Sequence, residues 1–203
     1  NTLMLGGAAV LIAVVVSLPL GIYTAIHQNT WKDTAGMIFA LFGTSMPNFW
    51  LGLMLIIIFS RKLGWFPTGG KGGLSSLVLP AVTVGFGLAA LLTRTTRSSM
   101  LDVLRQDYMT TARAKGCSEK QVITVHGLKN ALIPIITYLG THMAGIIGGA
   151  SIVETIFAIP GIGSYAIAGV QSKDYYVVQA YVLFSGCIYV LTNILIDLIY
   201  IAL

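Results

Sequence analysis

Five long apolar runs constrain this chain more than any other feature of its sequence. They cover residues 3–26, 35–59, 74–93, 131–153 and 176–203. Each run is long enough to cross the apolar core of a bilayer, which takes about 20 residues of α-helix. Within that core a segment must satisfy its own backbone hydrogen bonds, which favours helices. The sequence therefore predicts an all-α membrane protein, a polytopic helical bundle with about five spans here.

The composition excludes a soluble protein of this size. Only 9% of the residues are charged and 56% are apolar, with a mean hydropathy of +0.84. Soluble domains carry roughly a quarter of charged residues, so this chain cannot cover itself with a polar surface in water. It also lacks the GxSxG and HExxH motifs of hydrolases and the GxxxxGK[ST] loop that wraps nucleotide phosphates. We therefore expect a transport protein that is not an enzyme and binds no cofactor itself.

The charge distribution predicts the orientation. Residues 94–130 hold seven of the twelve Lys and Arg residues, which is typical of a cytoplasmic loop. Alternation then places eight basic residues inside and four outside, and puts Asn1 outside. A cytoplasmic N-terminus would need one more span, so we expect the full protein to have six, with a first helix and an external segment before this chain. The basic segment lacks interleaved aromatic residues, so nucleic acid is not an expected partner.

Within the basic segment, the sequence predicts a helix, a glycine turn and a second helix. Gly116 suits the left-handed position that ends a helix, and Ser118 with Gln121 forms a capping box that starts the next one. The small residues Ala112, Ala114 and Gly116 suggest a face that enters a partner's groove. A hairpin that only faces solvent is the alternative.

Several motifs together resemble a known family. The run Thr111-Ala-Arg-Ala-Lys-Gly116, followed by His126-Gly-Leu-Lys-Asn-Ala-Leu-Ile-Pro134, looks like the EAA motif loop of binding-protein-dependent ABC transporter permeases. Three further segments are similar to the dipeptide/oligopeptide/nickel branch, and to its first permease subunit: Ser45-Met-Pro-Asn-Phe-Trp50, Leu63-Gly-Trp-Phe-Pro-Thr-Gly69 and Val153-Glu-Thr-Ile-Phe-Ala-Ile-Pro-Gly-Ile-Gly163.

The resemblance implies a fold, partners and a location. Residues 1–203 would form a single transmembrane permease domain of the type I ABC importer kind, with 94–130 as its cytoplasmic coupling loop. The expected partners are a second permease subunit, two ATPase subunits that bind ATP and Mg²⁺, an extracytoplasmic substrate-binding protein and membrane lipid. The location would be a prokaryotic plasma (inner) membrane, crossed several times. The residues expected to contact the ATPase are Tyr108, Thr111, Ala112, Arg113, Ala114, Lys115 and Gly116.

The resemblance leaves the substrate open between peptides and nickel, as an ion or a chelate. His142, in the middle of a run, is a candidate nickel ligand and pathway residue, or a packed, hydrogen-bonded residue. Glu154 is a candidate contact for a cationic substrate, or a cap or interfacial anchor, and Asn48 is a third pathway candidate. A secondary transporter or channel subunit without an ATPase is the alternative function. It would normally show an internal repeat or intramembrane charge pairs, and the sequence shows neither.

Overall fold

The computed structural model describes residues 1–70 and 73–202, and this part of the chain is helical without a β-strand. The first half contains α1 (Thr2–Ile26), α2 (Trp31–Ser45), α3 (Asn48–Leu55), the π-helical segment η1 (Ile56–Lys62) and α4 (Leu74–Leu104). The second half contains α5 (Asp107–Ala114), α6 (Glu119–Gln121), the π-helical segment η2 (Val122–Gly127), α7 (Leu128–Gly149), α8 (Ser151–Ile156), α9 (Ile162–Gln171) and α10 (Tyr175–Ala202).

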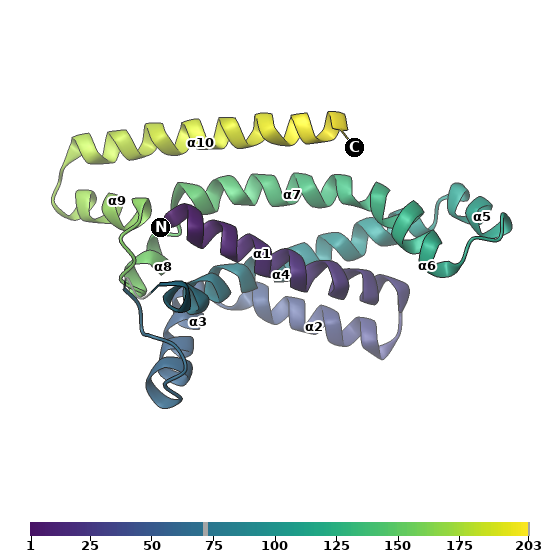
Figure 1. Ribbon diagram of the computed structural model, residues 1–203, viewed down its shortest axis with the longest axis horizontal. Helices are drawn as coiled ribbons and strands as arrows, with labels where there is room; N and C mark the ends of the chain where they lie inside the picture. Colours follow the sequence, from purple (N-terminus) through teal and green to yellow (C-terminus); the bar gives the residue numbers. More distant parts are fainter. Residues whose placement is uncertain (71–72, 203) are drawn as a thin grey trace.

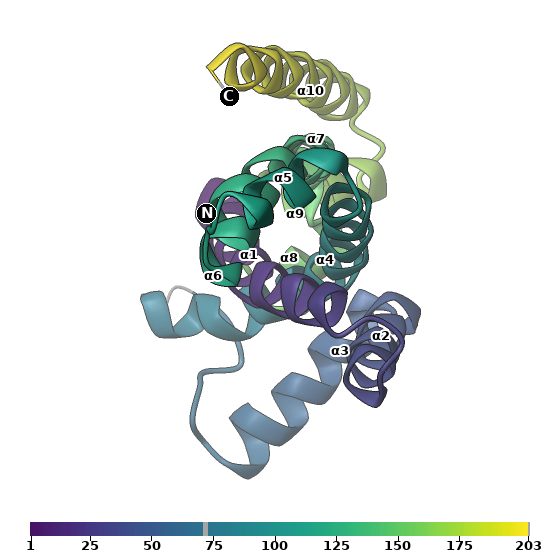
Figure 2. The ribbon, with the colours of Figure 1, turned by 90° about the vertical axis from the view of Figure 1, so that its right-hand side faces the viewer.

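Helix α4 lies at the centre of the molecule. It packs along α1 and also contacts α2, α3, α7 and α8. Figures 1 and 2 show α5 and α6 at one end of this bundle and α8 and α9 at the other. Helix α10 contacts α7 and α9 and runs along the outside. The turn before α2 lies at the same end as α5, as the predicted alternation of loops requires (Figure 1).

Small residues allow α4 to approach its neighbours closely. A Cβ on Gly85 would lie 2.8 Å from the backbone oxygen of Ala9 in α1. A Cβ on Gly43 of α2 would lie 2.6 Å from the Cβ of Ala90 in α4. Helices in membranes associate largely through such close backbone packing. The core therefore consists of small side chains from α1 and α4, interlocked with larger ones such as Leu5 and Leu92, which are fully buried.

Four of the five predicted runs lie on helices long and apolar enough to span a membrane. The run over 35–59 is wrong as one continuous span, because Trp31–Ser45 and Asn48–Lys62 meet at an angle of 98°. The cause is Pro47, which lacks an N–H and disfavours the helical conformation at the preceding residue. Met46 accordingly has an extended ψ of 122°.

The segment over 94–130 is more ordered than a loop. Helix α4 continues through it to Leu104, and a helical stretch beginning at Glu119 leads into α7. The segment between these two helical stretches consists of α5 and the turns on either side of it. The basic residues predicted to lie in a cytoplasmic loop are therefore divided between the ends of long helices and a short hairpin.

Candidate functional site

The hairpin formed by α5, the turn at 115–118 and α6 has the predicted local structure. Gly116 has φ of +83°, in the left-handed region that favours glycine. The capping box is also confirmed: the N–H of Gln121 donates to Ser118 Oγ at 3.4 Å, and the N–H of Ser118 donates to Gln121 Oε1 at 3.1 Å. This turn chemistry holds the two arms of the hairpin together.

The hairpin has a small core of its own. Met109 and Val122 are fully buried and Ala112 is 7% exposed, and Val103 and Leu104 at the end of α4 pack against them. Met109 and Ala112 lie three residues apart on α5, so both face inward. The predicted small-residue face is therefore divided, since Ala112 packs inside while Ala114 and Gly116 are exposed.

The other predicted coupling residues lie on the outside of the hairpin. Tyr108, Thr111, Arg113 and Lys115 are all exposed. Arg113 Nε donates to Glu119 Oε1 at 2.8 Å, across the turn. An exposed pair of this kind contributes about 0–1 kcal/mol to stability. The outer face of the hairpin is therefore polar and available to another protein.

Two of the predicted pathway residues, His142 and Asn48, line the same cavity. It measures about 400 Å³ and lies where α2 breaks into α3, against α4 and α7. Thr44 and the break residues Met46 and Pro47 also line it. The ring of His142 lies against that of Tyr138, with centroids 4.2 Å apart. Among the described residues, no group of three His, Cys, Asp or Glu side chains could hold a metal ion there.

Glu154 lies elsewhere, and its side chain is fully buried. It accepts hydrogen bonds from Thr2 Oγ1 at 2.6 Å and from the N–H of Ser164 at 2.8 Å. Thr2 Oγ1 in turn accepts from the N–H of Ile162 at 2.9 Å. The carboxylate therefore joins the start of α1 to the α8–α9 connection. Of the two readings of Glu154 from the sequence, the geometry favours a structural one.

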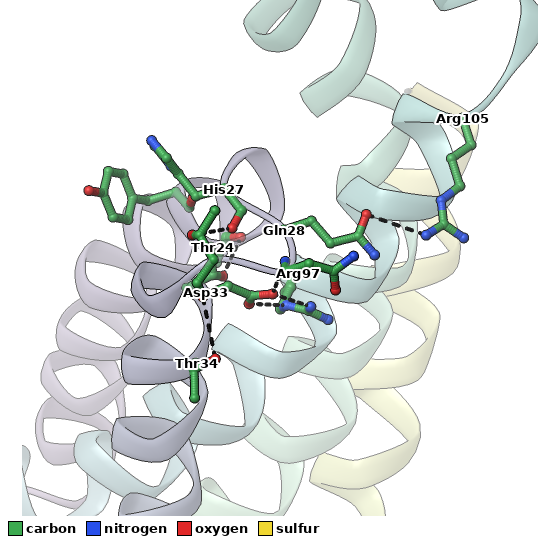
Figure 3. Close-up of polar contacts among 11 residues, drawn as sticks. Thr24, His27, Gln28, Asp33, Thr34, Arg97 and Arg105 are labelled. Carbon is green, nitrogen blue, oxygen red and sulfur yellow. Dashed lines mark hydrogen bonds and ion pairs between the residues drawn. The ribbon is translucent and has the colours of Figure 1, made fainter.

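An ion pair that was not predicted from the sequence joins Asp33, in the first turn of α2, to Arg97 in α4 (Figure 3). Arg97 belongs to the basic segment 94–130 that we predicted to be a cytoplasmic loop. A signal was present, because Asp33 is the only acidic residue among the first 101 positions. A single acid at the end of an apolar run needs a partner.

Comparison with known proteins identifies similar sequences over the whole chain. The family described as "Binding-protein-dependent transport system inner membrane component" matches residues 17–203. The glutathione transport system permease protein GsiC of Pectobacterium atrosepticum is 44% identical over 191 residues, which are 94% of this chain and 62% of that protein. The GsiC protein of Escherichia coli K12 is 41% identical over 202 residues, 100% of this chain and 66% of that protein. This chain thus spans about 62–66% of the length of these curated relatives.

Solved structures with a similar backbone exist at low sequence identity. Two inward-facing structures of the MetNI methionine ABC transporter match at 16% identity with TM-scores of 0.78 and 0.84. Each match covers 99% of this chain and 92% of the other. A crystal structure of an amino acid ABC transporter with histidines matches at 15% identity with a TM-score of 0.72.

Proposed function

Because this chain belongs to the family of binding-protein-dependent transport system inner membrane components, we propose that it is part of a permease subunit that imports peptides at the expense of ATP hydrolysed by separate subunits. Its fold is that of the type I ABC importer permeases, as predicted. The observation that carries the proposal is the hairpin at one end of the bundle. It has its own core and an exposed polar face that includes Arg113 and Lys115.

The hairpin is suited to transmit force because it is joined rigidly to two long helices. Val103 and Leu104 of α4 belong to its core, and η2 continues from it into α7. Both α4 and α7 line the cavity that contains His142 and Asn48. A displacement of the hairpin by an ATPase subunit therefore moves two walls of that cavity. ATP shifts this equilibrium only if the ATPases contact the hairpin differently in the two states.

The cavity supports a peptide more than a bare nickel ion. The polar side chains in its lining are those of Thr44, Asn48 and His142, and none of the lining residues is charged. A hydroxyl, an amide and an imidazole match the hydrogen-bonding groups of a peptide. A single imidazole is a poor site for Ni²⁺, which prefers several nitrogen or oxygen ligands. The GsiC relatives are named for glutathione transport, so we propose a substrate of that tripeptide's size and chemistry.

The proposed assembly includes a second permease subunit, two ATPase subunits and an extracytoplasmic binding protein, located in a prokaryotic inner membrane. The apolar side chains exposed along α10 are consistent with a permease dimer. The ATPases, with ATP and Mg²⁺, would dock on α5 through Tyr108, Thr111, Arg113 and Lys115, with Ala114 and Gly116 beside them.

Substitutions in the hairpin test the proposed coupling. In the full-length protein, Gly116→Pro cannot adopt the observed φ of +83°, and Arg113→Glu reverses the charge of the outer face. We expect both variants to insert normally and to lose substrate uptake in membrane vesicles. Lys173→Glu, an exposed reversal at the opposite end, is the matched control and should keep uptake. Normal uptake by both hairpin variants would contradict the proposal.

A further inference from the structure

A largely buried ion pair connects the first turn of α2 to α4 (Figure 3). Arg97 Nε donates to Asp33 Oδ1 and Arg97 Nη2 donates to Asp33 Oδ2, both at 2.6 Å. The N–H of Asn29 adds a third hydrogen bond to the same carboxylate at 3.1 Å. The side chain of Asp33 is 7% exposed and that of Arg97 is 23% exposed. A two-pronged contact between Arg and a carboxylate fixes orientation as well as distance.

The backbones of three helices meet close to this pair. A Cβ on Gly21 of α1 would lie 2.6 Å from the Cβ of Thr96, which precedes Arg97 in α4. A Cβ on Gly36 of α2 would overlap the methyl group of Thr24 in α1. Helices α1, α2 and α4 are therefore packed as closely as small residues allow, and the ion pair sets the register of α2 along α4.

The pair lies between the hairpin and the cavity. From Arg97, α4 runs about two turns to Val103 and Leu104, which pack in the hairpin core. From Asp33, α2 runs the other way to Gly43 and Thr44, which line the cavity. Force that enters through the hairpin thus reaches this side of the cavity by passing from α4 to α2.

We propose that Asp33 and Arg97 are positioning residues that make α2 move together with α4 when the hairpin is displaced. This inference rests on the proposed coupling function. An ion pair that is taken out of water adds little net stability. Its contribution is therefore to fix the position of α2 relative to α4. Without it, α2 is held to α4 only by contacts between small and apolar side chains, which specify the register less sharply.

The test is the amount of substrate transported per ATP hydrolysed, measured on the full-length permease assembled with its partners in proteoliposomes. Asp33→Asn and Arg97→Lys each break the two-pronged contact. The double variant Asp33→Asn/Arg97→Gln removes both charges and leaves no unpaired buried ion, so it should assemble normally. We expect all three variants to hydrolyse ATP but to transport on the order of tenfold less substrate per ATP. A factor of this size is typical of the coupling between two sites in one protein. Arg94→Lys, an exposed position one turn earlier on α4, is the matched control and should keep the ratio.

Two results would overturn the inference. One is a wild-type ratio of transport to hydrolysis in the double variant and in Asp33→Asn. The other is a lower yield of complex whose assembled fraction keeps the wild-type ratio, since the pair would then be only structural. Gly116→Pro in the same vesicles separates this failure from that of the proposed function. If Gly116→Pro abolishes uptake while the pair variants keep the wild-type ratio of transport to hydrolysis, only the role of the pair is refuted. If Gly116→Pro also transports normally, the coupling role of the hairpin fails too.

Discussion

At the scale of single residues, Glu154 shows how a carboxylate in an apolar setting is accommodated. Its oxygens accept hydrogen bonds from Thr2 and from the backbone of Ser164. Gly161 and Gly163 lie against the carboxylate, and a Cβ at Gly163 would come within 3.0 Å of Oε2. Because there is no room for side chains at these glycines, the chain folds tightly around Glu154. The residue connects segments that are 152 positions apart.

We predict that Glu154→Ala destabilises the fold. It leaves the Thr2 hydroxyl and the Ser164 N–H without their acceptor, at about 1–3 kcal/mol for each buried group. A loss of about 2–6 kcal/mol should lower the midpoint of thermal unfolding in detergent by at least roughly 4 °C, at about 2–4 °C per kcal/mol for a chain of this size. Glu154→Gln should lose less, because its amide can still accept one bond and donate another to the Thr2 hydroxyl. Thr155→Ala, exposed and adjacent, is the control, and an unchanged midpoint in Glu154→Ala would contradict the structural role.

At the scale of elements, the break between α2 and α3 shapes the interior more than any other feature. The two helical segments meet at 98°, and Met46, Pro47 and Asn48 line the cavity at this point. Prolines elsewhere do not break their helices: Pro19, Pro80 and Pro134 lie inside α1, α4 and α7. In those helices the residue before proline remains helical, whereas Met46 is extended.

We therefore predict that Pro47→Ala straightens the pair α2–α3. The substitution restores an N–H and removes the restriction on Met46, so the helix can continue. Spin labels on cysteines that replace Trp31 and Lys62, with Cys117 and Cys187 changed to Ser, should move further apart. Pro80→Ala, within a continuous helix, should leave the distance between these labels unchanged. The same distance in Pro47→Ala as in the parent would show that packing alone maintains the bend.

At the scale of the whole molecule, the bundle leaves a large apolar surface uncovered. In the part of the chain that the structure describes, α10 packs closely against α7 and α9 alone. Its side chains Val182, Leu183 and Leu195 are each more than half exposed. Exposed apolar surface of this extent marks an interface or contact with lipid. The uncovered face of α10 is therefore available to lipid or to another subunit.

The proposed assembly predicts the composition of the complex. The full-length protein, purified from membranes in mild detergent, should bring a second permease and two ATPase subunits with it. Arg113→Glu should lose the ATPases and keep the second permease. Binding protein loaded with glutathione should stimulate ATP hydrolysis, and binding protein exposed to Ni²⁺ alone should not. Purification of the wild-type protein without any ATPase would favour the secondary transporter or channel that the sequence left as an alternative.

Features that depend on neighbours in the sequence were predictable. The apolar runs, the left-handed Gly116 and the capping box of Ser118 and Gln121 follow from chemistry within about four residues. The motifs that resemble the family are also local strings. The prediction was wrong at Pro47, because a proline in an apolar run either kinks or breaks a helix, and the surrounding packing decides between them.

The tertiary structure alone decided which distant residues meet. Asp33 and Arg97 are 64 positions apart, and no periodicity relates them. The burial of Ala112 against Val122 and the shared cavity of Asn48 and His142 have the same origin. Local preferences specify each helix, whereas the faces that come together depend on the shape of all the helices at once. The sequence by itself therefore determined the helices and the turn of the hairpin, and packing between helices determined the ion pair, the buried carboxylate and the cavity.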